Sequence, residues 1–197
     1  VKDGPSYEEL LETEARPRLR SWLERIRAEG LAEFGVVHGY WPVVSRGRSL
    51  IVLDPDDHSH ELGSWTFPRQ RRDRRLCLAD LFRDEQEAAT HGPDLLGMQL
   101  VTMGDKVAGK TAELFAADAY RDYLELHGLS VQLTEALAEF WHHRVRTELG
   151  LAAEDGSVEE AINDQAYRGS RYRFGYPAWP DLESRALLVE LLQPGRI

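Results

Sequence analysis

The stretch from Tyr167 to Asp181 gathers the residue types that recognise small ligands. It places three arginines among aromatic residues, glycines and prolines: Arg168, Arg171, Arg173, Tyr172, Phe174, Tyr176, Trp179, Gly169, Gly175, Pro177 and Pro180. Arginine offers a fork of donors to a carboxylate, an aromatic face accepts a cation, and glycine lets the backbone approach a ligand. A zwitterionic sulfonium that carries a purine would use all three. Composition alone supports equally a rigid loop with aromatic anchors and solvated arginines.

A second stretch, Gly104 to Thr111, fits the Gly-x4-Gly-Lys-Thr spacing of a phosphate-binding P-loop. It follows a predicted strand and precedes a predicted helix, as such a loop does. The sequence nevertheless predicts no parallel βαβ succession and no second strand that ends in a metal-binding aspartate. A nucleotide-binding protein that needs Lys110 for ATP binding is therefore an alternative hypothesis.

The histidines do not form a convincing metal site. His142 and His143 are adjacent, so on a helix their side chains diverge by about 100° and a packing role is favoured. His58 and His60 flank Ser59 in an acidic loop, where two histidines alone make a poor site. The sequence also lacks the Gly-x-Ser-x-Gly and His-Glu-x-x-His patterns. We therefore predict no metal ligand and no catalytic side chain.

Charge and composition bound the class of protein. The 197 residues include 42% hydrophobic and 29% charged residues, which is ordinary for one folded domain spanning 1–197. The net charge of −10 disfavours a nucleic-acid partner. Five arginines crowd between positions 69 and 75, but Asp73 interrupts them, and a solvated face or local ion pairs are the expected roles.

The single cysteine, Cys77, excludes an internal disulfide and favours a reducing, cytoplasmic setting. No apolar run approaches the roughly twenty residues that cross a bilayer, so we expect no membrane association. The chain begins at Val1 without a methionine. We expect it to be an excised piece that lacks flanking segments at both ends.

The first half of the sequence predicts helices and then strands. A capping box at Ser6–Glu9 begins a helix near Tyr7, Pro17 divides the helical stretch, and Gly30 ends it. Four strands follow, rich in branched and aromatic residues: Val36–Trp41 and Leu50–Leu53 as a hairpin, Glu61–Phe67, and Gly97–Met103.

The second half predicts helices. One stripe of apolar residues predicts a helix that ends at His127–Gly128, and a second stripe from Leu133 to Val145 predicts another helix. A shorter helix spans Ser157–Tyr167, and a last one spans Asp181–Leu192. Strands followed by long helices, without βαβ alternation, predict an α+β fold in which helices pack on a mostly antiparallel sheet.

The segment Arg171-Tyr-Arg-Phe-Gly175-Tyr176 resembles the Arg-x-x-x-Gly-Tyr signature of the reactivation (activation) domains of cobalamin-dependent methionine synthases. The resemblance covers nearly the whole chain in the family order, through Gly35-Val-Val, Trp41-Pro42, Pro68-Arg-Gln70, Cys77-Leu-Ala-Asp80, Gln99-Leu-Val-Thr-Met-Gly104, Asp122-Tyr-Leu124 and Leu133-Thr-Glu-Ala-Leu-Ala-Glu139. It implies the activation-domain fold.

The resemblance also implies a site. Arg171 would engage the methionyl end of S-adenosylmethionine, with the backbone through Arg173 and Gly175 against the ligand and Tyr176 beside the methyl group. Glu135 would lie near the ligand's amino group. Trp179 replaces the small residue or cysteine that is common in the family. Further ligand residues are expected before Val1 and after Ile197, so this piece would hold an incomplete pocket.

By the same resemblance, the function would be to support reductive methylation of cob(II)alamin to methylcobalamin, as part of a methyltransferase in methionine biosynthesis. The cofactors implied are S-adenosylmethionine and cobalamin, the latter held by another domain. The partners implied are the cobalamin-binding domain of the same polypeptide and a flavodoxin-like or ferredoxin-like electron donor. A non-catalytic docking module for the cobalamin domain is the remaining alternative.

Overall fold

The computed structural model describes residues 4–157, 160, 167 and 169–196. The chain divides into two compact units. The first comprises Val1–Val36 with Val101–Ala138, and the second comprises Val37–Leu100 with Glu139–Ile197. The expectation of one domain over 1–197 stays a prediction.

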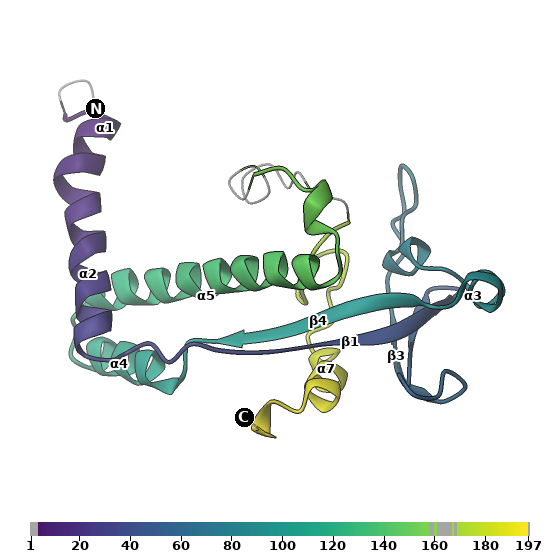
Figure 1. Ribbon diagram of the computed structural model, residues 1–197. Coiled ribbons are helices and arrows are strands. Elements are labelled where there is room, and N and C mark those ends of the chain that lie inside the picture. Colours follow the sequence, from purple (N-terminus) through teal and green to yellow (C-terminus); the bar gives the residue numbers. More distant parts are fainter. Residues whose placement is uncertain (1–3, 158–159, 161–166, 168, 197) are drawn as a thin grey trace. The chain divides into compact units, whose positions relative to one another are not determined.

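The N-terminal helical stretch begins where the sequence predicts. Ser6 accepts a hydrogen bond from the backbone of Glu9 at 3.1 Å and caps α1 (Tyr7–Leu10). A π-helical segment (Leu11–Ala15) follows, and then α2 (Arg16–Ala28). Pro17 lies in the first turn of α2, where a missing N–H is tolerated. Pro17 therefore does not interrupt the helix; the turn before it widens instead (Figure 1).

The predicted helix end at His127–Gly128 is wrong. Helix α4 (Asp105–Ala116) ends before Asp118, whose φ of 55° lies in the left-handed region, and α5 then runs unbroken over Tyr120–Glu148. One helical glycine costs only about 1 kcal/mol. Burial near Gly128 offsets that cost, because Leu126 is fully buried in the core of the first unit.

The core of the first unit joins α2 to α4 and α5. Its buried residues are Trp22, Ile26, Leu31, Met103, Val107 and Leu126. At its edge Glu125 accepts hydrogen bonds from the Trp22 indole at 2.9 Å and the Arg18 guanidinium at 2.8 Å. The Trp22 bond is the main reason that the pKa of Glu125 is lowered.

The sheet confirms the predicted strands and their antiparallel arrangement. Its order is β3-β2-β1-β4, and its strands are β1 (Gly35–Arg46), β2 (Ser49–Leu53), β3 (Glu61–Thr66) and β4 (Asp94–Thr102). Val43 pairs with Val52 across the hairpin, and Leu50 pairs with Trp65. The fold is therefore α+β, as expected.

Helices cover both faces of this sheet in the second unit. On one face α7 (Arg185–Leu192) buries Leu188 and Leu192 against Val43, Val52 and Met98 (Figure 1). On the other, α3 (Glu85–His91), which the sequence reasoning did not predict, packs Ala88 against a smaller cluster, Val44, Ile51 and Leu53. The remaining described elements are 3₁₀ turns at Leu78–Leu81, Ala152–Glu154 and Pro194–Arg196.

The end of α5 approaches the sheet closely at Gly97. A Cβ at this position would lie 3.2 Å from Val145 Cγ1, a tight contact that favours glycine there. Beside this contact Glu148 accepts a hydrogen bond from the Tyr40 hydroxyl at 2.5 Å, and its carboxylate lies 3.1 Å from His38 Nε2. These bonds, Tyr40 first, lower the pKa of Glu148 to about 2, and burial followed by the Glu148 bond raises the pKa of Tyr40 to about 12.

Gly128→Ala should stabilise the protein by about 0.5–1 kcal/mol, because a Cβ there meets nothing within 4 Å and alanine favours the helix. Urea unfolding of both proteins measures the difference. Gly104→Ala is the contrast: its φ is 78° and a Cβ would lie 2.8 Å from that of Glu33, so it should destabilise. Two changes of the same sign would contradict this account of Gly128.

Glu148→Gln should flatten the acid dependence of stability. The folded pKa of Glu148 is about 2, below its ordinary 4.5, so its contribution is complete above pH 4.5 and lost as the pH falls toward 2. Urea midpoints measured across that window should fall less steeply in the variant. Glu24→Gln, on α2, controls for the loss of a carboxylate elsewhere. If the urea midpoints of the wild type and of Glu148→Gln depended on pH with equal slopes, the stabilising role of the Glu148 hydrogen bonds with Tyr40 and His38 would be refuted.

Candidate functional site

A tight turn shapes the segment that the sequence singles out. The Gly175 amide donates to the Trp179 carbonyl at 2.8 Å, and the Trp179 amide donates back to the Tyr176 carbonyl at 2.8 Å. Gly175 has a φ of 86°, and a Cβ there would lie 3.1 Å from Leu182 Cδ2. The positive φ makes any residue with a side chain strained at this position, and the close contact adds to the preference for glycine.

Trp179 anchors this turn to the sheet. Its ring lies 4.3 Å from that of Phe174, 4.9 Å from Phe67 and 5.2 Å from Trp65, all measured between centroids. The buried Trp179 indole nitrogen has no hydrogen-bond partner among the residues that the structure describes. Trp179 thus acts through apolar packing, which confirms the aromatic-anchor interpretation for this one residue.

Arg173 and Tyr176 form a pair on the exposed side of the turn. The Arg173 guanidinium donates to the Tyr176 hydroxyl at 2.6 Å and lies 4.5 Å from the centre of the ring. Both side chains are exposed, Tyr176 by 50%. The arrangement presents a cation and a ring together at the surface.

Arg171 differs, because it points inward to α5. Its guanidinium forms an ion pair with Glu139, and the two side chains are only 20% and 26% exposed. Glu139 is a site residue that was not predicted from the sequence. A signal was available, since Glu139 follows Glu135 by four residues, the spacing that puts two side chains on one helix face.

Further charged and aromatic groups surround this ion pair on α5. Arg146, which is 5% exposed, donates to Asp155 at 2.7 Å and lies 4.9 Å from the centre of the Tyr167 ring. The Arg146 bond lowers the pKa of Asp155. Burial, then Arg146 and Arg171, lower the pKa of His142, whose ring packs edge-on against Tyr167 at 5.0 Å. His142 is therefore a neutral packing residue at pH 7, as its sequence context favours.

The structure brings four of the five predicted site residues into one unit. Arg171, Arg173, Gly175 and Tyr176 belong to the second unit, whereas Glu135, which is half-buried, belongs to the first. A joint contact of Glu135 and Arg171 with one ligand stays a prediction. Arg168 lies outside the described residues, as does most of the predicted Ser157–Tyr167 helix. The capping box that the sequence predicts at the start of that helix is present, since the Glu160 amide donates to Ser157 Oγ at 3.2 Å.

The P-loop hypothesis is wrong. Gly104 is the N-cap of α4, and every residue from Asp105 to Thr111 is helical, so no loop remains to surround a phosphate. Lys110 instead forms an ion pair with Glu113 at 3.1 Å, and the Thr111 hydroxyl donates to the Ala108 carbonyl.

In the described part of the chain, no group of three or more His, Cys, Asp or Glu residues is arranged to hold a metal ion, and this includes the loop of His58 and His60, here called the histidine loop. His60 lies 3.7 Å from Asp54, and both His58 and His60 are exposed. Within the described residues, no helix is long and apolar enough to cross a membrane.

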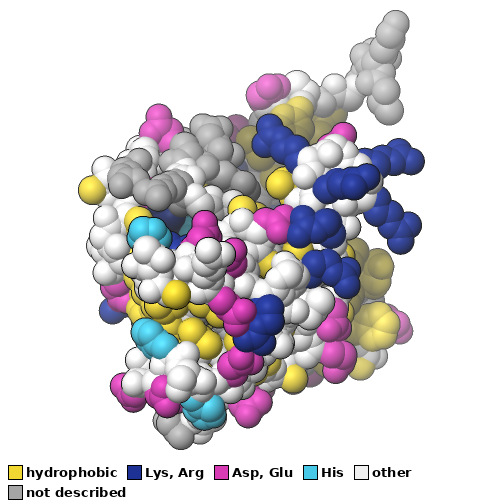
Figure 2. Space-filling model, turned by 90° about the vertical axis from the view of Figure 1, so that its right-hand side faces the viewer, with side chains coloured by type: hydrophobic (Ala, Val, Ile, Leu, Met, Phe, Trp, Pro, Cys, Tyr) yellow, Lys and Arg dark blue, Asp and Glu magenta, His cyan; other side chains and the backbone are white. Residues whose placement is uncertain are grey.

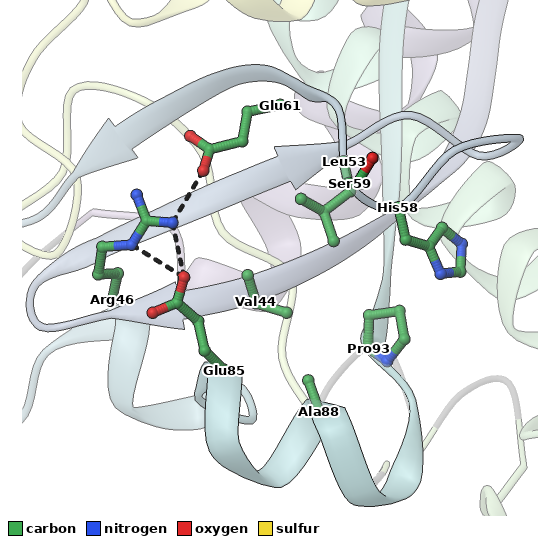
Figure 3. A pocket seen from close by; sticks show the side chains of 9 residues that line it. All are labelled: Val44, Arg46, Leu53, His58, Ser59, Glu61, Glu85, Ala88 and Pro93. Atoms are coloured by element: carbon green, nitrogen blue, oxygen red, sulfur yellow. Dashed lines mark hydrogen bonds and ion pairs between the residues drawn. The ribbon is translucent and has the colours of Figure 1, made fainter.

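A cavity of about 350 Å³ lies elsewhere in the second unit, between the hairpin, the histidine loop and α3 (Figure 3). Arg46 bridges its rim, 2.8 Å from Glu61 and 2.6 Å from Glu85. Val44, Leu53 and Ala88 form apolar parts of its lining. None of the predicted ligand-binding residues lines it, and the Arg46 bridge explains its polar rim as a structural contact.

Comparison with known proteins gives a consistent result. The family model described as "Vitamin B12 dependent methionine synthase, activation domain" matches residues 13–196. The chain is 52% identical over 204 residues to methionine synthase of Mycobacterium tuberculosis (strain ATCC 25618 / H37Rv), covering 99% of this chain and 17% of that protein. For methionine synthase of Mycobacterium leprae (strain TN) the identity is 49% over 203 residues, with 98% and 17% covered.

A solved structure agrees with these relatives. The crystal structure of the MetH reactivation domain bound to AdoHcy superimposes with a TM-score of 0.82 at 25% identity, covering 99% of this chain and 63% of that chain. The chain thus spans 17% of the length of the two methionine synthases. The match over residues 13–196 and the 52% identity establish that the chain belongs to the vitamin B12 dependent methionine synthase activation domain family.

Proposed function

We propose that this chain binds S-adenosylmethionine and, within a methionine synthase, supports the reductive methylation of cobalamin. The observation that carries the proposal is the likeness, at a TM-score of 0.82, to a reactivation domain with AdoHcy bound. AdoHcy is S-adenosylhomocysteine, the product that remains when S-adenosylmethionine gives up its methyl group. The inward-facing Arg171 adds chemical support, since a partly buried guanidinium suits a ligand carboxylate.

Glu139 acts in this proposal by orienting Arg171. The carboxylate of Glu139 holds the planar guanidinium of Arg171 in one orientation. The ligand's carboxylate then binds an arginine that is already oriented, without a search through rotamers. An ion pair at this position also keeps the arginine in place when the ligand is absent.

Arg173, Gly175 and Tyr176 form the exposed side of the proposed site. The positive φ of Gly175 turns the backbone so that Tyr176 projects from the surface, and the bond from Arg173 fixes the hydroxyl. The face of an aromatic ring attracts a cation such as a sulfonium. Glu135 is proposed to bind the ligand's ammonium group, for which a carboxylate is the matching charge.

Cobalamin, held by another domain, supplies the cobalt nucleophile that accepts the methyl group. The residues of this chain bind and orient the methyl donor, so the proposal assigns them no proton transfer. The partners proposed are the cobalamin-binding domain of the same polypeptide and a flavodoxin-like or ferredoxin-like electron donor. The setting proposed is the cytoplasm.

Calorimetric titration with S-adenosylhomocysteine tests the proposal, on this chain and on a version lengthened at both ends. Arg171→Ala should weaken binding by about tenfold to a hundredfold, because a hydrogen-bonded charge pair with the ligand is lost. Arg20→Ala, an exposed arginine of α2, is the matched control and should leave the affinity within about twofold. Binding of 5′-methylthioadenosine, which lacks the amino-acid part, should be indifferent to Arg171.

Glu139→Gln separates orientation from folding. It should weaken S-adenosylhomocysteine but not 5′-methylthioadenosine, whereas a merely damaged fold would weaken both. If the lengthened protein failed to bind S-adenosylhomocysteine, or bound it equally well without Arg171, the ligand-binding proposal would fail. The docking-module alternative would then replace it. Tighter binding by Glu139→Gln would mean that Glu139 competes with the ligand, contrary to the proposed role.

A further inference from the structure

The loop from Arg69 to Arg75, here called the arginine loop, is the most concentrated positive charge in the sequence. It follows β3, and all five of its arginines are exposed: Arg69, Arg71, Arg72, Arg74 and Arg75. Figure 2 shows Lys and Arg side chains gathered on one part of the surface, with some carboxylates next to them and the visible imidazoles on another part of the same view. Such a patch is unexpected on a chain with a net charge of −10.

The carboxylates that follow the loop in sequence are engaged either by Arg69 or by groups outside the loop. Asp80 binds Arg69 through both oxygens at 2.6 Å, and Glu85 binds Arg46. Asp84 caps α3 by accepting from the backbone of Glu87 at 2.8 Å. In the described ranges, no ion pair reaches the other four arginines of the loop. The expected role as local ion-pair donors therefore holds for Arg69 alone.

Hydrogen bonds hold the loop in one conformation. The Gln70 amide donates to the Leu76 carbonyl at 2.9 Å, and the Arg69 guanidinium donates to the Arg75 carbonyl at 2.8 Å. Asp73 and Arg75 have φ values of 54° and 51°, a region that residues other than glycine adopt uncommonly. A surface ordered in this way loses little conformational entropy when a partner binds.

We infer that the arginine loop is a docking surface for an acidic protein. A guanidinium fork matches carboxylate geometry, and arginine is enriched where protein interfaces bind most strongly. Two exposed apolar side chains, Leu76 and Leu81 at 46% and 61% exposure, lie close in sequence to the arginines and offer contact area that a phosphate backbone would not use. Asp73 within the loop and the net charge of −10 both disfavour nucleic acid.

The proposed function narrows the partner to an acidic electron-donor protein, so this step of the inference rests on the proposed function. Each reductive methylation consumes one electron as the carbon–sulfur bond of S-adenosylmethionine breaks and a cobalt–carbon bond forms. In the proposed function, that electron comes from a one-electron donor protein outside this chain. Electron-transfer complexes are small, short-lived and steered by opposite charge, which the exposed arginines of the loop provide.

The test compares two double charge reversals of identical net charge. Arg71→Glu/Arg74→Glu alters the arginine loop, and Arg20→Glu/Arg27→Glu alters exposed arginines of α2. The probes are an acidic flavodoxin, an acidic [2Fe–2S] ferredoxin and a single-stranded RNA of about twelve nucleotides. Fluorescence anisotropy at 50 and 300 mM salt gives the affinities, and calorimetry with S-adenosylhomocysteine checks the ligand site of each variant.

We expect at least one acidic protein to bind the wild type, more weakly at high salt, and to lose about tenfold or more in affinity with the loop variant but less than about twofold with the α2 variant. Unchanged S-adenosylhomocysteine titrations would show that the ligand site is intact. Absence of binding by both proteins, equal loss in the two variants, or tighter binding of RNA would overturn the inference. If docking depends on the loop while S-adenosylhomocysteine fails to bind, the docking surface stands and the proposed ligand function fails.

Discussion

The ion pair between Arg171 and Glu139 is the contact on which the account of this site depends. It joins the segment carrying the family signature to α5, within the second unit. Two partly buried charges cost solvation energy unless they are paired and hydrogen-bonded. Close to this pair, Arg146 is paired with Asp155. The lowered pKa of His142 leaves its imidazole neutral at pH 7, so His142 adds no positive charge beside Arg171.

Packing of Trp179 imposes the second constraint. Its ring contacts with Phe174, Phe67 and Trp65 fix one side of the turn to the sheet, while Arg173 and Tyr176 remain exposed on the other. A bulky residue at this position therefore stabilises the turn. The same segment thus combines the two interpretations that composition left open, with an aromatic anchor and a candidate ligand surface.

Local rules predicted much of the fold. Capping at Ser6 and the enrichment of branched and aromatic residues in the strands depend on neighbouring residues, and the structure confirms the helix start and the predicted hairpin. The errors arose where tertiary packing outweighed local preference. Burial of Leu126 stabilises α5 across Gly128, so the helix does not end there. The residues that fit a P-loop pattern form the first turns of α4 instead of a loop. The helical spacing from Glu135 could mark Glu139 as a candidate, but its pairing with Arg171 spans 32 positions, so no local pattern reveals the partner.

A crystal structure of this chain with S-adenosylhomocysteine tests the central claim most directly. The account predicts that a guanidinium nitrogen of Arg171 lies about 3 Å from the ligand's carboxylate. It also predicts that Arg171 keeps its contact with Glu139 and that the Tyr176 ring lies beside the ligand's sulfur. A ligand carboxylate bound elsewhere, with Arg171 still directed only at Glu139, would contradict it.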